Sequence, residues 1–357
     1  MDIAITKTQE PKIKPTDEST LGFARTFSDH MFITEYEEGQ WRNPRIVPYQ
    51  KLSLDPASPV FHYAQEIFEG AKAYSLDNGE VGLFRIEDNA RRMNRSADRM
   101  CMPAIDVDLQ VEAILRLVDL DRDWVPTSEG TSLYLRPTMI ADGTSLGAHT
   151  ASRFIYFVIA SPTGSYYQQG SKPIRIRIET RHVRAVKGGV GRAKTGGNYA
   201  ASFKASSNAK SEGFNEVLWL DGRTQSYVQE VGAMNMMFVV DGRIVTSELG
   251  DTILPGITRD SVLTLAREKG IGVEEGKIAV ADLYDAYDKG LLTEAFGTGT
   301  AAVISPVGEL TWNDRTIVLN NNEMGPISEM FYTELVGIQR QRLPDTHGWT
   351  SVVPRYK

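Results

Sequence analysis

The chain has 357 residues, of which 41% are hydrophobic and 24% are charged, and its formal net charge is −7. This length suggests two domains, and this composition is ordinary for a soluble globular protein. The interspersed charges provide no basic stripe for a nucleic acid, and the single cysteine, Cys101, excludes internal disulfides and cysteine-pair zinc sites.

The first twenty residues mix lysines with acidic residues and contain two prolines. This pattern is typical neither of a signal peptide nor of an arginine-rich transit peptide. No apolar run in the sequence is long enough to span a bilayer. We therefore expect a flexible N-terminal arm over 1–20 and a cytoplasmic protein that has no membrane partner.

The next part of the chain, 21–163, mixes strands and helices. The small or apolar residues Ala90, Met93 and Ala97 recur at three- and four-residue spacing, which predicts a helix. Short segments rich in β-branched and aromatic residues predict strands. The predicted elements are strands at 32–36, 81–85, 131–137 and 153–162, the last two ending at a proline, and helices at 87–100 and around 111–118.

A polar segment with two glycines and a closing proline, 164–173, is the best candidate for a linker. After it, the strict alternation of 174–179 predicts a strand with one face in water. The other predicted elements of this part are strands at 216–221, 234–240 and 243–248 and helices at 258–270, 281–290 and 327–342.

Strands outnumber long helices, and the two do not alternate regularly. The sequence therefore predicts an α+β protein of two domains rather than a doubly wound sheet. The expected boundaries are a small N-terminal domain over 21–163, the linker over 164–173 and a large C-terminal domain over 174–357.

The most unusual stretch, 186–206, has five glycines within ten residues around Lys194. A phosphate-binding P-loop needs glycine where Ala193 stands, and a dinucleotide fingerprint needs its third glycine where Lys194 stands. Both readings are therefore disfavoured. From spacing alone, a surface loop with an incidental lysine remains an equal alternative to a ligand-facing lysine. The scattered histidines show no ligand-like spacing, so no metal is expected.

Four weaker features accompany this loop. The segment 295–303 could form a nest of backbone N–H groups, and a helix that begins near Thr258 could bind an anion at its N-terminus. Glu230 precedes an apolar strand, and Arg92 lies on an arginine-rich helix. Taken singly, each is better explained as a turn, a helix cap, a solvated carboxylate or a solvated helix face. Together they supply the lysine, phosphate cradles, arginine and carboxylate that pyridoxal phosphate requires.

At these residues the sequence resembles the branched-chain aminotransferases of pyridoxal-phosphate fold type IV. The resemblance extends from about Gly22 to Trp349, and its motifs follow the order of that family. They are HYAQEIFEGAKAY (62–74), NARRMNRSADRMCMP (89–103), YLRP (134–137), KTGGNYAAS (194–202), EVGAMN (230–235), LPGITRD (254–260) and GTGTAAVISPVG (297–308).

The resemblance implies the fold of D-amino-acid aminotransferase, with a smaller N-terminal α/β domain and a larger C-terminal domain that has a β-barrel-like core. It implies that Lys194 is the Schiff-base lysine, that Tyr199 bonds the phenolic oxygen of the cofactor and that Glu230 pairs with its pyridine nitrogen. The residues implied for the phosphate are Arg92 rather than Arg91, with Ile257, Thr258 and Thr300.

The resemblance also implies a substrate pocket and a partner subunit. The pocket would be lined by Phe23, Tyr63, Phe68, Tyr134, Arg136 and Tyr166, with the backbone N–H of Ala301 at the substrate carboxylate. A homodimer is implied, in which the segment 141–148, including Leu146, reaches the neighbouring active site. Two departures exist: Ala233 replaces a threonine of the animal enzymes, and their redox-active Cys-x-x-Cys is absent.

The activity implied is ping-pong transfer of an amino group from L-leucine, L-isoleucine or L-valine to 2-oxoglutarate, which gives glutamate. D-Amino-acid aminotransferase and aminodeoxychorismate lyase share the fold and are the nearest alternatives. A nucleotide-binding or non-catalytic interaction protein is an alternative of a different class. It would be colourless, whereas a pyridoxal enzyme absorbs visible light.

Overall fold

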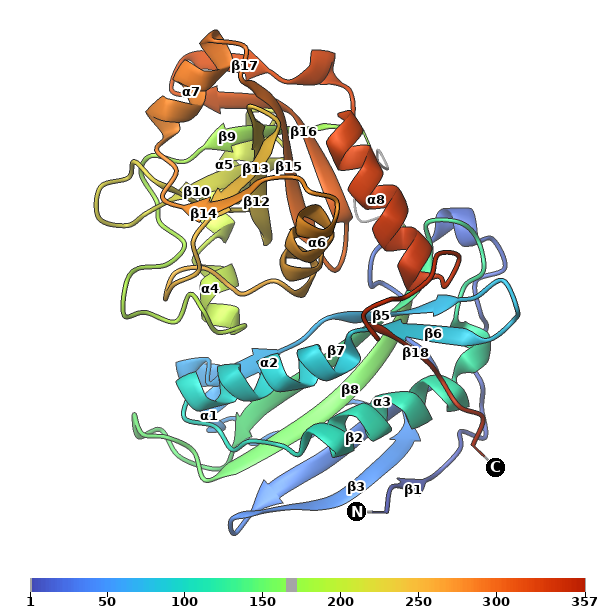
Figure 1. Ribbon diagram of the computed structural model, residues 1–357. Helices are drawn as coiled ribbons and strands as arrows, with labels where there is room; N and C mark the ends of the chain where they lie inside the picture. The colour runs from blue at the N-terminus through green and yellow to red at the C-terminus, as the bar shows by residue number, and fades with distance from the viewer. Residues whose placement is uncertain (1, 165–171, 357) are drawn as a thin grey trace. The chain divides into compact units, whose positions relative to one another are not determined.

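The computed structural model describes residues 2–164 and 172–356, which divide into two compact units (Figure 1). The first unit contains the described residues before 165, the short segment Ala193–Gly196 and the chain from Gly337 onward. The second contains 172–192 and Gly197–Val336. The predicted linker lies largely outside the described residues. Within these residues, no helix has the length and apolarity needed to cross a membrane.

This division differs from the predicted domains in two places. The prediction assigned the whole of 174–357 to the C-terminal domain, whereas Ala193–Gly196 and the C-terminal end pack with the first unit. The first unit is thereby the longer one, not the smaller. The reason is that its sheet accepts a strand from the far end of the chain: Thr350–Val352 pairs with Val81–Phe84.

The first unit is built on a nine-stranded sheet with the order β1-β3-β2-β8-β7-β5-β6-β18, and β4 pairs beside β7. Its strands are β1 (Ala4–Ile5), β2 (His30–Glu37), β3 (Gln40–Pro48), β4 (Glu66–Phe68), β5 (Ala71–Ser75), β6 (Val81–Phe84), β7 (Ser132–Asp142), β8 (Arg153–Thr163) and β18 (Thr350–Val352).

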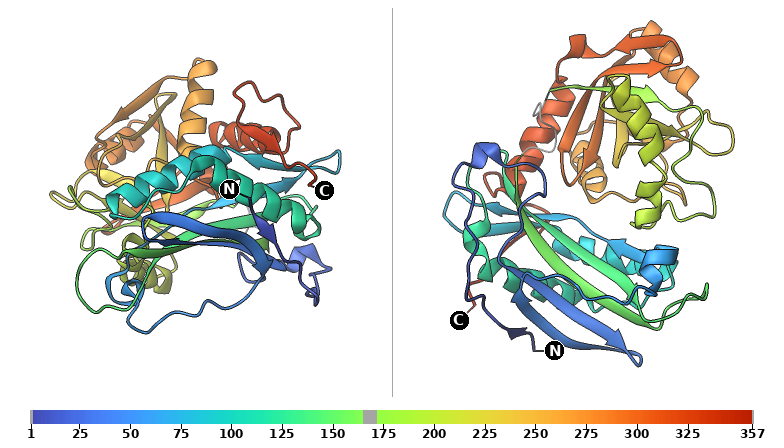
Figure 2. Two further views of the ribbon diagram at one scale, coloured as in Figure 1. Left: turned by 90° about the horizontal axis from the view of Figure 1, so that it is seen from below. Right: turned by 180° about the vertical axis from the view of Figure 1, so that it is seen from behind.

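Two helices lie along one face of this sheet (Figures 1 and 2). They are α2 and α3. The residues that predicted the first of these helices, Ala90, Met93 and Ala97, are buried. The second begins after Asp106, whose side chain accepts a hydrogen bond from Leu109 N and so caps the helix. Leu133 and Leu135 of β7 join the core beneath these helices. Because side chains alternate along a strand, Tyr134 lies on the opposite face. The helical elements are α1 (Pro59–Tyr63), α2 (Ile86–Arg99), α3 (Val107–Leu120), η1 (Glu18–Thr20) and η2 (Arg122–Trp124).

Strand β7 does not end at Pro137, as the sequence had suggested, but continues to Asp142. On one side, β7 pairs with β5 through 133–135 and with β4 through 138–140. Pro137 falls between these two partners, where the ladder requires no N–H group on that side. The missing donor therefore costs the sheet no hydrogen bond there.

The N-terminal segment, for which a flexible arm was expected, is attached to the first unit at several points. Strand β1 pairs with β3. The backbone N–H of Thr8 donates to His30 Nε2 at 2.9 Å, and that of Lys12 donates to Asp29 Oδ1 at 2.8 Å. These contacts connect the segment to the start of β2.

The second unit contains a closed barrel. Six of its strands follow the ring β11-β10-β9-β16-β15-β12, which closes through the pairing of β11 with β12; the predicted barrel-like core is thus confirmed. The strands are β9 (Ile174–Ile178), β10 (Glu216–Leu220), β11 (Val228–Val231), β12 (Met234–Val240), β13 (Arg243–Ser247), β14 (Val273–Gly276), β15 (Leu292–Gly299), β16 (Val303–Trp312) and β17 (Arg315–Val318).

Alternation along β12 decides which residues face outward. Met234, Met236 and Phe238 join the core of the second unit. Asn235 therefore points to the other face of the strand. The helical elements of this unit are α4 (Gly196–Ala200), α5 (Phe203–Ser211), α6 (Ile257–Glu268), α7 (Val280–Asp288), η3 (Asn320–Asn322) and α8 (Pro326–Gln339), which continues into the first unit.

Candidate active site

Lys194 is held on the first unit by its own backbone. Its N–H donates to Ser96 Oγ at 2.9 Å, and its carbonyl accepts from Phe68 N at 3.0 Å. The next residue, Thr195, donates its hydroxyl to the carbonyl of Glu66 at 2.7 Å. A loose surface loop would not be bonded in this way, so the structure favours the ligand-facing interpretation of this lysine.

The lysine side chain lies in an aromatic and cationic cluster. Its Nζ is 5.0 Å from the centre of the Phe68 ring, and the Arg136 guanidinium is 4.8 Å from the same ring. Arg136 Nη2 donates to the hydroxyl of Tyr134 at 3.0 Å. Phe23 packs edge-on against Tyr134, with ring centres 4.9 Å apart. The first unit thus brings together five of the residues predicted for the active site.

Arg92 is bound by a carboxylate that the sequence analysis did not assign. Its Nε and Nη2 donate to the two oxygens of Glu69 at 2.7 and 2.8 Å, and Asn89 also donates to this carboxylate at 2.7 Å. Both partners of the ion pair are buried. Burial by itself would raise the pKa of Glu69, but Arg92, the nearby Lys194 and Asn89 lower it overall. The buried pair fixes the guanidinium in one orientation.

Glu66 is a second carboxylate beside the lysine segment. It accepts a hydrogen bond from the backbone N–H of Gly196, and a Cβ on Gly196 would collide with its Oε1. Burial raises the pKa of Glu66, although this bond and the charge of Arg136 act in the other direction. Gly196 is therefore needed for the close approach of the lysine segment to β4.

In the second unit, Glu230 is a buried carboxylate that Leu254, Asn235 and Arg184 contact. Leu254 N donates to its Oε1 at 2.7 Å, and Asn235 Nδ2 reaches the same oxygen at 3.4 Å. Arg184 Nε lies 2.9 Å from Oε2, an ion pair whose angle is outside the range of a hydrogen bond. Arg184 Nη2 also donates to the carbonyl of Thr252. The sequence analysis missed Arg184, because no spacing marked it among the other arginines.

The predicted phosphate cradles also lie in this unit. Helix α6 begins at Ile257 and Thr258 after Gly256, which has no side chain to cap the first turn. Thr300 and Ala301 lie in the turn between β15 and β16. The residue after this turn, Val303, has a φ of 61°, a strained conformation of the kind found at ligand sites.

The barrel face that includes Glu230 has a buried hydroxyl that a polar cofactor would satisfy. Glu230, Asn235 and Thr298 are register partners across β11, β12 and β15, so they share one face. Thr298 Oγ1 is buried and has no hydrogen-bond partner among the described residues. An unpartnered polar atom in the interior requires an explanation. A polar cofactor bound beside the Glu230 carboxylate and the α6 N-terminus would explain it.

The remaining predicted residues are more scattered. Tyr63 ends α1, is 43% exposed and donates its hydroxyl to the carbonyl of Leu146, which is itself exposed. Tyr199 lies half-buried on α4. Ala233 is in the tight turn between β11 and β12. Tyr166 falls outside the described residues.

Glu216 lies against the turn between β11 and β12, and its ionisation predicts a dependence of stability on pH. The carboxylate of Glu216 lies so close to Gly232 that a Cβ there would be 2.4 Å from Oε2. Burial raises the pKa of Glu216 from 4.5 to about 7, although Lys210 opposes this. Because the folded pKa exceeds the unfolded one, ionisation destabilises the fold progressively between about pH 4.5 and 7.

We therefore expect Glu216→Gln to raise the free energy of unfolding at pH 8 by up to about 3 kcal/mol and to leave it unchanged near pH 4. Urea unfolding at both pH values measures this difference. The exposed Glu323→Gln serves as a control, which should show no such pH dependence. A stabilisation by Glu216→Gln that is equal at both pH values would contradict the assignment.

Comparison with known proteins identifies the family. Residues 66–310 match the family described as Amino-transferase class IV. The chain is 49% identical to branched-chain-amino-acid aminotransferase 2 of Bacillus subtilis (strain 168), over 98% of this chain and 96% of that protein. It is 47% identical to a probable branched-chain-amino-acid aminotransferase of Staphylococcus aureus (strain N315), over 99% of each chain.

Solved structures agree with these matches. The branched-chain amino acid aminotransferase of Escherichia coli aligns with a TM-score of 0.75 at 25% identity, over 91% of this chain and 99% of that one. The enzyme of the same name from Thermobaculum terrenum, in its PLP-form, gives 0.73 at 25% identity, over 90% and 98%. The fold and the site therefore define a transaminase of fold type IV. The chain belongs to the class IV aminotransferase family.

Proposed function

We propose that the protein is a pyridoxal-phosphate-dependent branched-chain amino-acid aminotransferase, which transfers the amino group of L-leucine, L-isoleucine or L-valine to 2-oxoglutarate. The observation that carries the proposal is the position of the Lys194 amine beside the cluster of Phe68, Tyr134 and Arg136. The names of the relatives at 47 to 49% identity support it.

The residues of this chain divide the work of holding the cofactor. Pyridoxal phosphate, when bound, supplies an electron sink and a carbon that accepts the amino group. Arg92, Thr300 and the first turn of α6 at Ile257 and Thr258 would hold its phosphate. Glu230 would keep the pyridine nitrogen protonated, and Arg184 lies in an ion pair with its Oε2. Tyr199 would donate to the phenolic oxygen.

Lys194 has two tasks, covalent attachment and proton transfer. Once released, its Nζ would take the proton from the substrate Cα and return it two bonds away, on the carbon that accepts the amino group. It must be uncharged when it takes that proton. The backbone bonds of Lys194 to Ser96 and Phe68 fix the base of the side chain, so the amine alone swings between these positions.

One pocket must accept both an apolar and an acidic side chain. The rings of Phe23, Phe68 and Tyr134 provide the apolar walls. Arg136 and the hydroxyl it bonds provide donors for the second carboxylate of 2-oxoglutarate. Tyr63 and Tyr166 would extend the walls, and the N–H of Ala301 would bind the substrate carboxylate, since Ala233 offers no hydroxyl.

We also propose a homodimer in the cytoplasm. Leu146 is 67% exposed and receives the hydroxyl of the half-exposed Tyr63, which is a surface that a second copy could cover. A free Cys101 needs no oxidising compartment. Sedimentation velocity of the wild type and of Leu146→Asp would test the dimer, and an unchanged sedimentation coefficient would contradict this contact.

The function is tested by colour and by turnover. We expect the purified protein to absorb visible light, as a lysine-bound pyridoxal does. With L-leucine or L-valine and 2-oxoglutarate, glutamate should accumulate in proportion to the branched 2-oxo acid. With D-alanine as donor, no glutamate should form. Turnover of D-alanine alone would instead support a D-amino-acid aminotransferase, and a colourless, inactive protein would refute both.

A further inference from the structure

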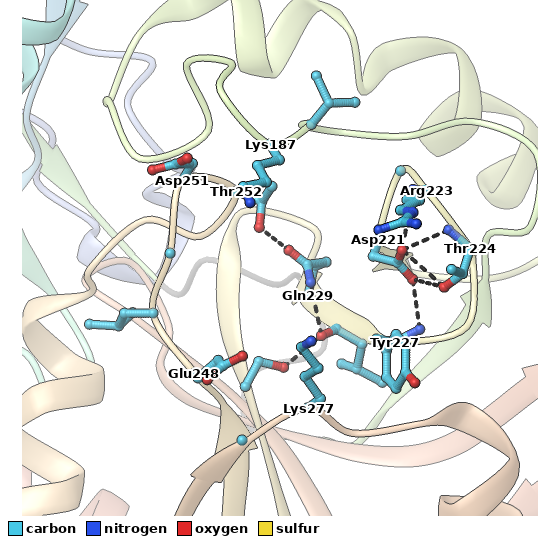
Figure 3. Close-up of a pocket in the computed structure, with 17 residues that line it drawn as sticks. Lys187, Asp221, Arg223, Thr224, Tyr227, Gln229, Glu248, Asp251, Thr252 and Lys277 are labelled. Atoms are coloured by element: carbon cyan, nitrogen blue, oxygen red, sulfur yellow. Dashed lines mark hydrogen bonds between the residues drawn. The ribbon is translucent and has the colours of Figure 1, made fainter.

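The second unit has a cavity that the proposed reaction does not use. Its volume is about 710 Å³, within the usual range for small-molecule sites. Figure 3 shows residues from the walls of this cavity, which come from five places. They are the loop at Val186–Lys187, the turn 221–224, the start of β11 at 227–229, the segment 247–252 and the end of β14 at Gly276–Lys277.

Six charged side chains line the cavity, three cations and three carboxylates, so its formal net charge is zero. Lys187, Arg223 and Lys277 form no ion pair with any described residue. Asp221 accepts the backbone N–H groups of its own turn, and Asp251 accepts that of Gly188 at 3.3 Å. Glu248 is the remaining carboxylate. The three cations are therefore the charged groups most available to a ligand, and a carboxylate is a group that such donors bind through charge-assisted hydrogen bonds.

Apolar surface accompanies these charges. Val186 is 48% exposed and Leu249 is 44% exposed at the rim of the cavity. The ring of Tyr227 lies below Lys277, whose Nζ is 5.9 Å from the ring centre. Positive charge next to exposed aliphatic and aromatic surface fits an anion that also has a compact apolar group.

The wall of the cavity is continuous with the partners of Glu230. The hydroxyl of Thr252, in the wall, donates to the side chain of Gln229, the residue before Glu230 on β11. The carbonyl of Thr252 accepts from Arg184, which pairs with Glu230. Two residues further on, Leu254 N donates to Glu230. A ligand that displaces this segment must therefore disturb the carboxylate.

We propose that this cavity binds a small carboxylate with a compact apolar group, and that binding regulates the enzyme through the Thr252–Arg184–Glu230 contacts. The regulatory part rests on the proposed function, because it requires Glu230 to serve the cofactor. The binding part does not.

The probe is 3-methylbutanoate, with acetate as the probe without an apolar group and 3-methylbutanamide as the probe without charge. Calorimetry on the holoenzyme should detect a 3-methylbutanoate site outside the active site, which binds acetate and the amide at least about tenfold more weakly. Lys187→Gln/Lys277→Gln should weaken this site by about tenfold or more. The matched control Lys204→Gln/Lys289→Gln, which lies outside the cavity, should bind as the wild type does.

Gly250→Leu is a second variant that fills the cavity. No atom lies within 4 Å of a Cβ at Gly250, and its φ is not in the left-handed region. We expect this variant to keep its transaminase activity and to lose the additional site. Equal binding by the cavity variants and the control would overturn the proposal.

Kinetics separate the regulatory part from the proposed function. In the wild type and the control, 3-methylbutanoate should change kcat when both L-leucine and 2-oxoglutarate are saturating and shift the visible absorbance, whereas competition at the active site changes KM alone. Both effects should vanish in Lys187→Gln/Lys277→Gln. Binding without a change in kcat or absorbance would overturn the coupling. Absence of transamination in the wild type would refute the proposed function, while calorimetry would still decide the binding site.

Discussion

Lys194→Ala is expected to lower kcat/KM for L-leucine by a factor on the order of 10⁴ or more. The substitution removes both the covalent attachment and the base that moves the Cα proton. The backbone bonds of this residue to Ser96 and Phe68 do not involve the side chain, so the fold should survive. Steady-state glutamate formation and the visible spectrum measure the two losses.

Lys204→Ala and Lys289→Ala are matched controls, since both remove a lysine side chain from the surface of the second unit. They should keep the kcat and the absorbance of the wild type. If Lys194→Ala retained a tenth of the wild-type activity with the same spectrum, this lysine could not be the catalytic one. Thermal unfolding of each variant tests whether a loss of activity is caused by a loss of folded structure.

Glu69→Ala is expected to lower the free energy of unfolding by about 3 to 5 kcal/mol. The substitution leaves the Arg92 guanidinium buried without the carboxylate that accepts from its Nε and Nη2. An unpaired charge in the interior costs far more than a pair at the surface. Urea unfolding at neutral pH measures the change. Cofactor affinity should fall with it, because Arg92 loses its fixed orientation.

The neighbouring arginine offers a matched control. Arg91 pairs with Glu87 at 3.0 Å, but both side chains are more than half exposed. Glu87→Ala should therefore change stability by roughly 1 kcal/mol or less. If Glu69→Ala and Glu87→Ala had the same free energy of unfolding, the buried Arg92–Glu69 ion pair would not contribute more to stability than the exposed pair.

Local patterns were sufficient for the elements with strong periodicity. The helix predicted at 87–100 is α2 (Ile86–Arg99), and the strand predicted at 234–240 is β12. Their apolar residues repeat with the period of the structure they form. The sequence predicted that β7 would end at Pro137, because proline usually ends a strand within a sheet. That prediction was wrong, since β7 continues to Asp142. Pro137 is tolerated because it lies opposite the gap between β4 and β5, where no N–H group is needed. The position of this gap depends on tertiary structure and cannot be read from the local sequence.

The sequence predicted residues of the candidate site only where they lie in a recognisable motif. Lys194 stood out by its glycines, and the resemblance assigned Glu230 and Arg92. Glu69 lies within a quoted motif but was given no role, because its partner is distant in sequence. Arg184 was missed for the same reason, since only folding brings it to Glu230. Buried ion pairs are properties of tertiary structure, so single-residue patterns do not reveal them.

The C-terminal strand has a consequence for synthesis on the ribosome. Strand β18 completes the sheet of the first unit by pairing with β6, and Val353 beyond it is fully buried there. The N-terminal half therefore cannot finish folding when it leaves the exit tunnel, because the strand that completes its sheet is translated only after the whole second unit. Until then β6 presents an open edge of the kind that recruits foreign strands. A stop codon placed just before Thr350 would leave that edge open permanently, so the truncated chain would depend on chaperones although every proposed catalytic residue had been translated.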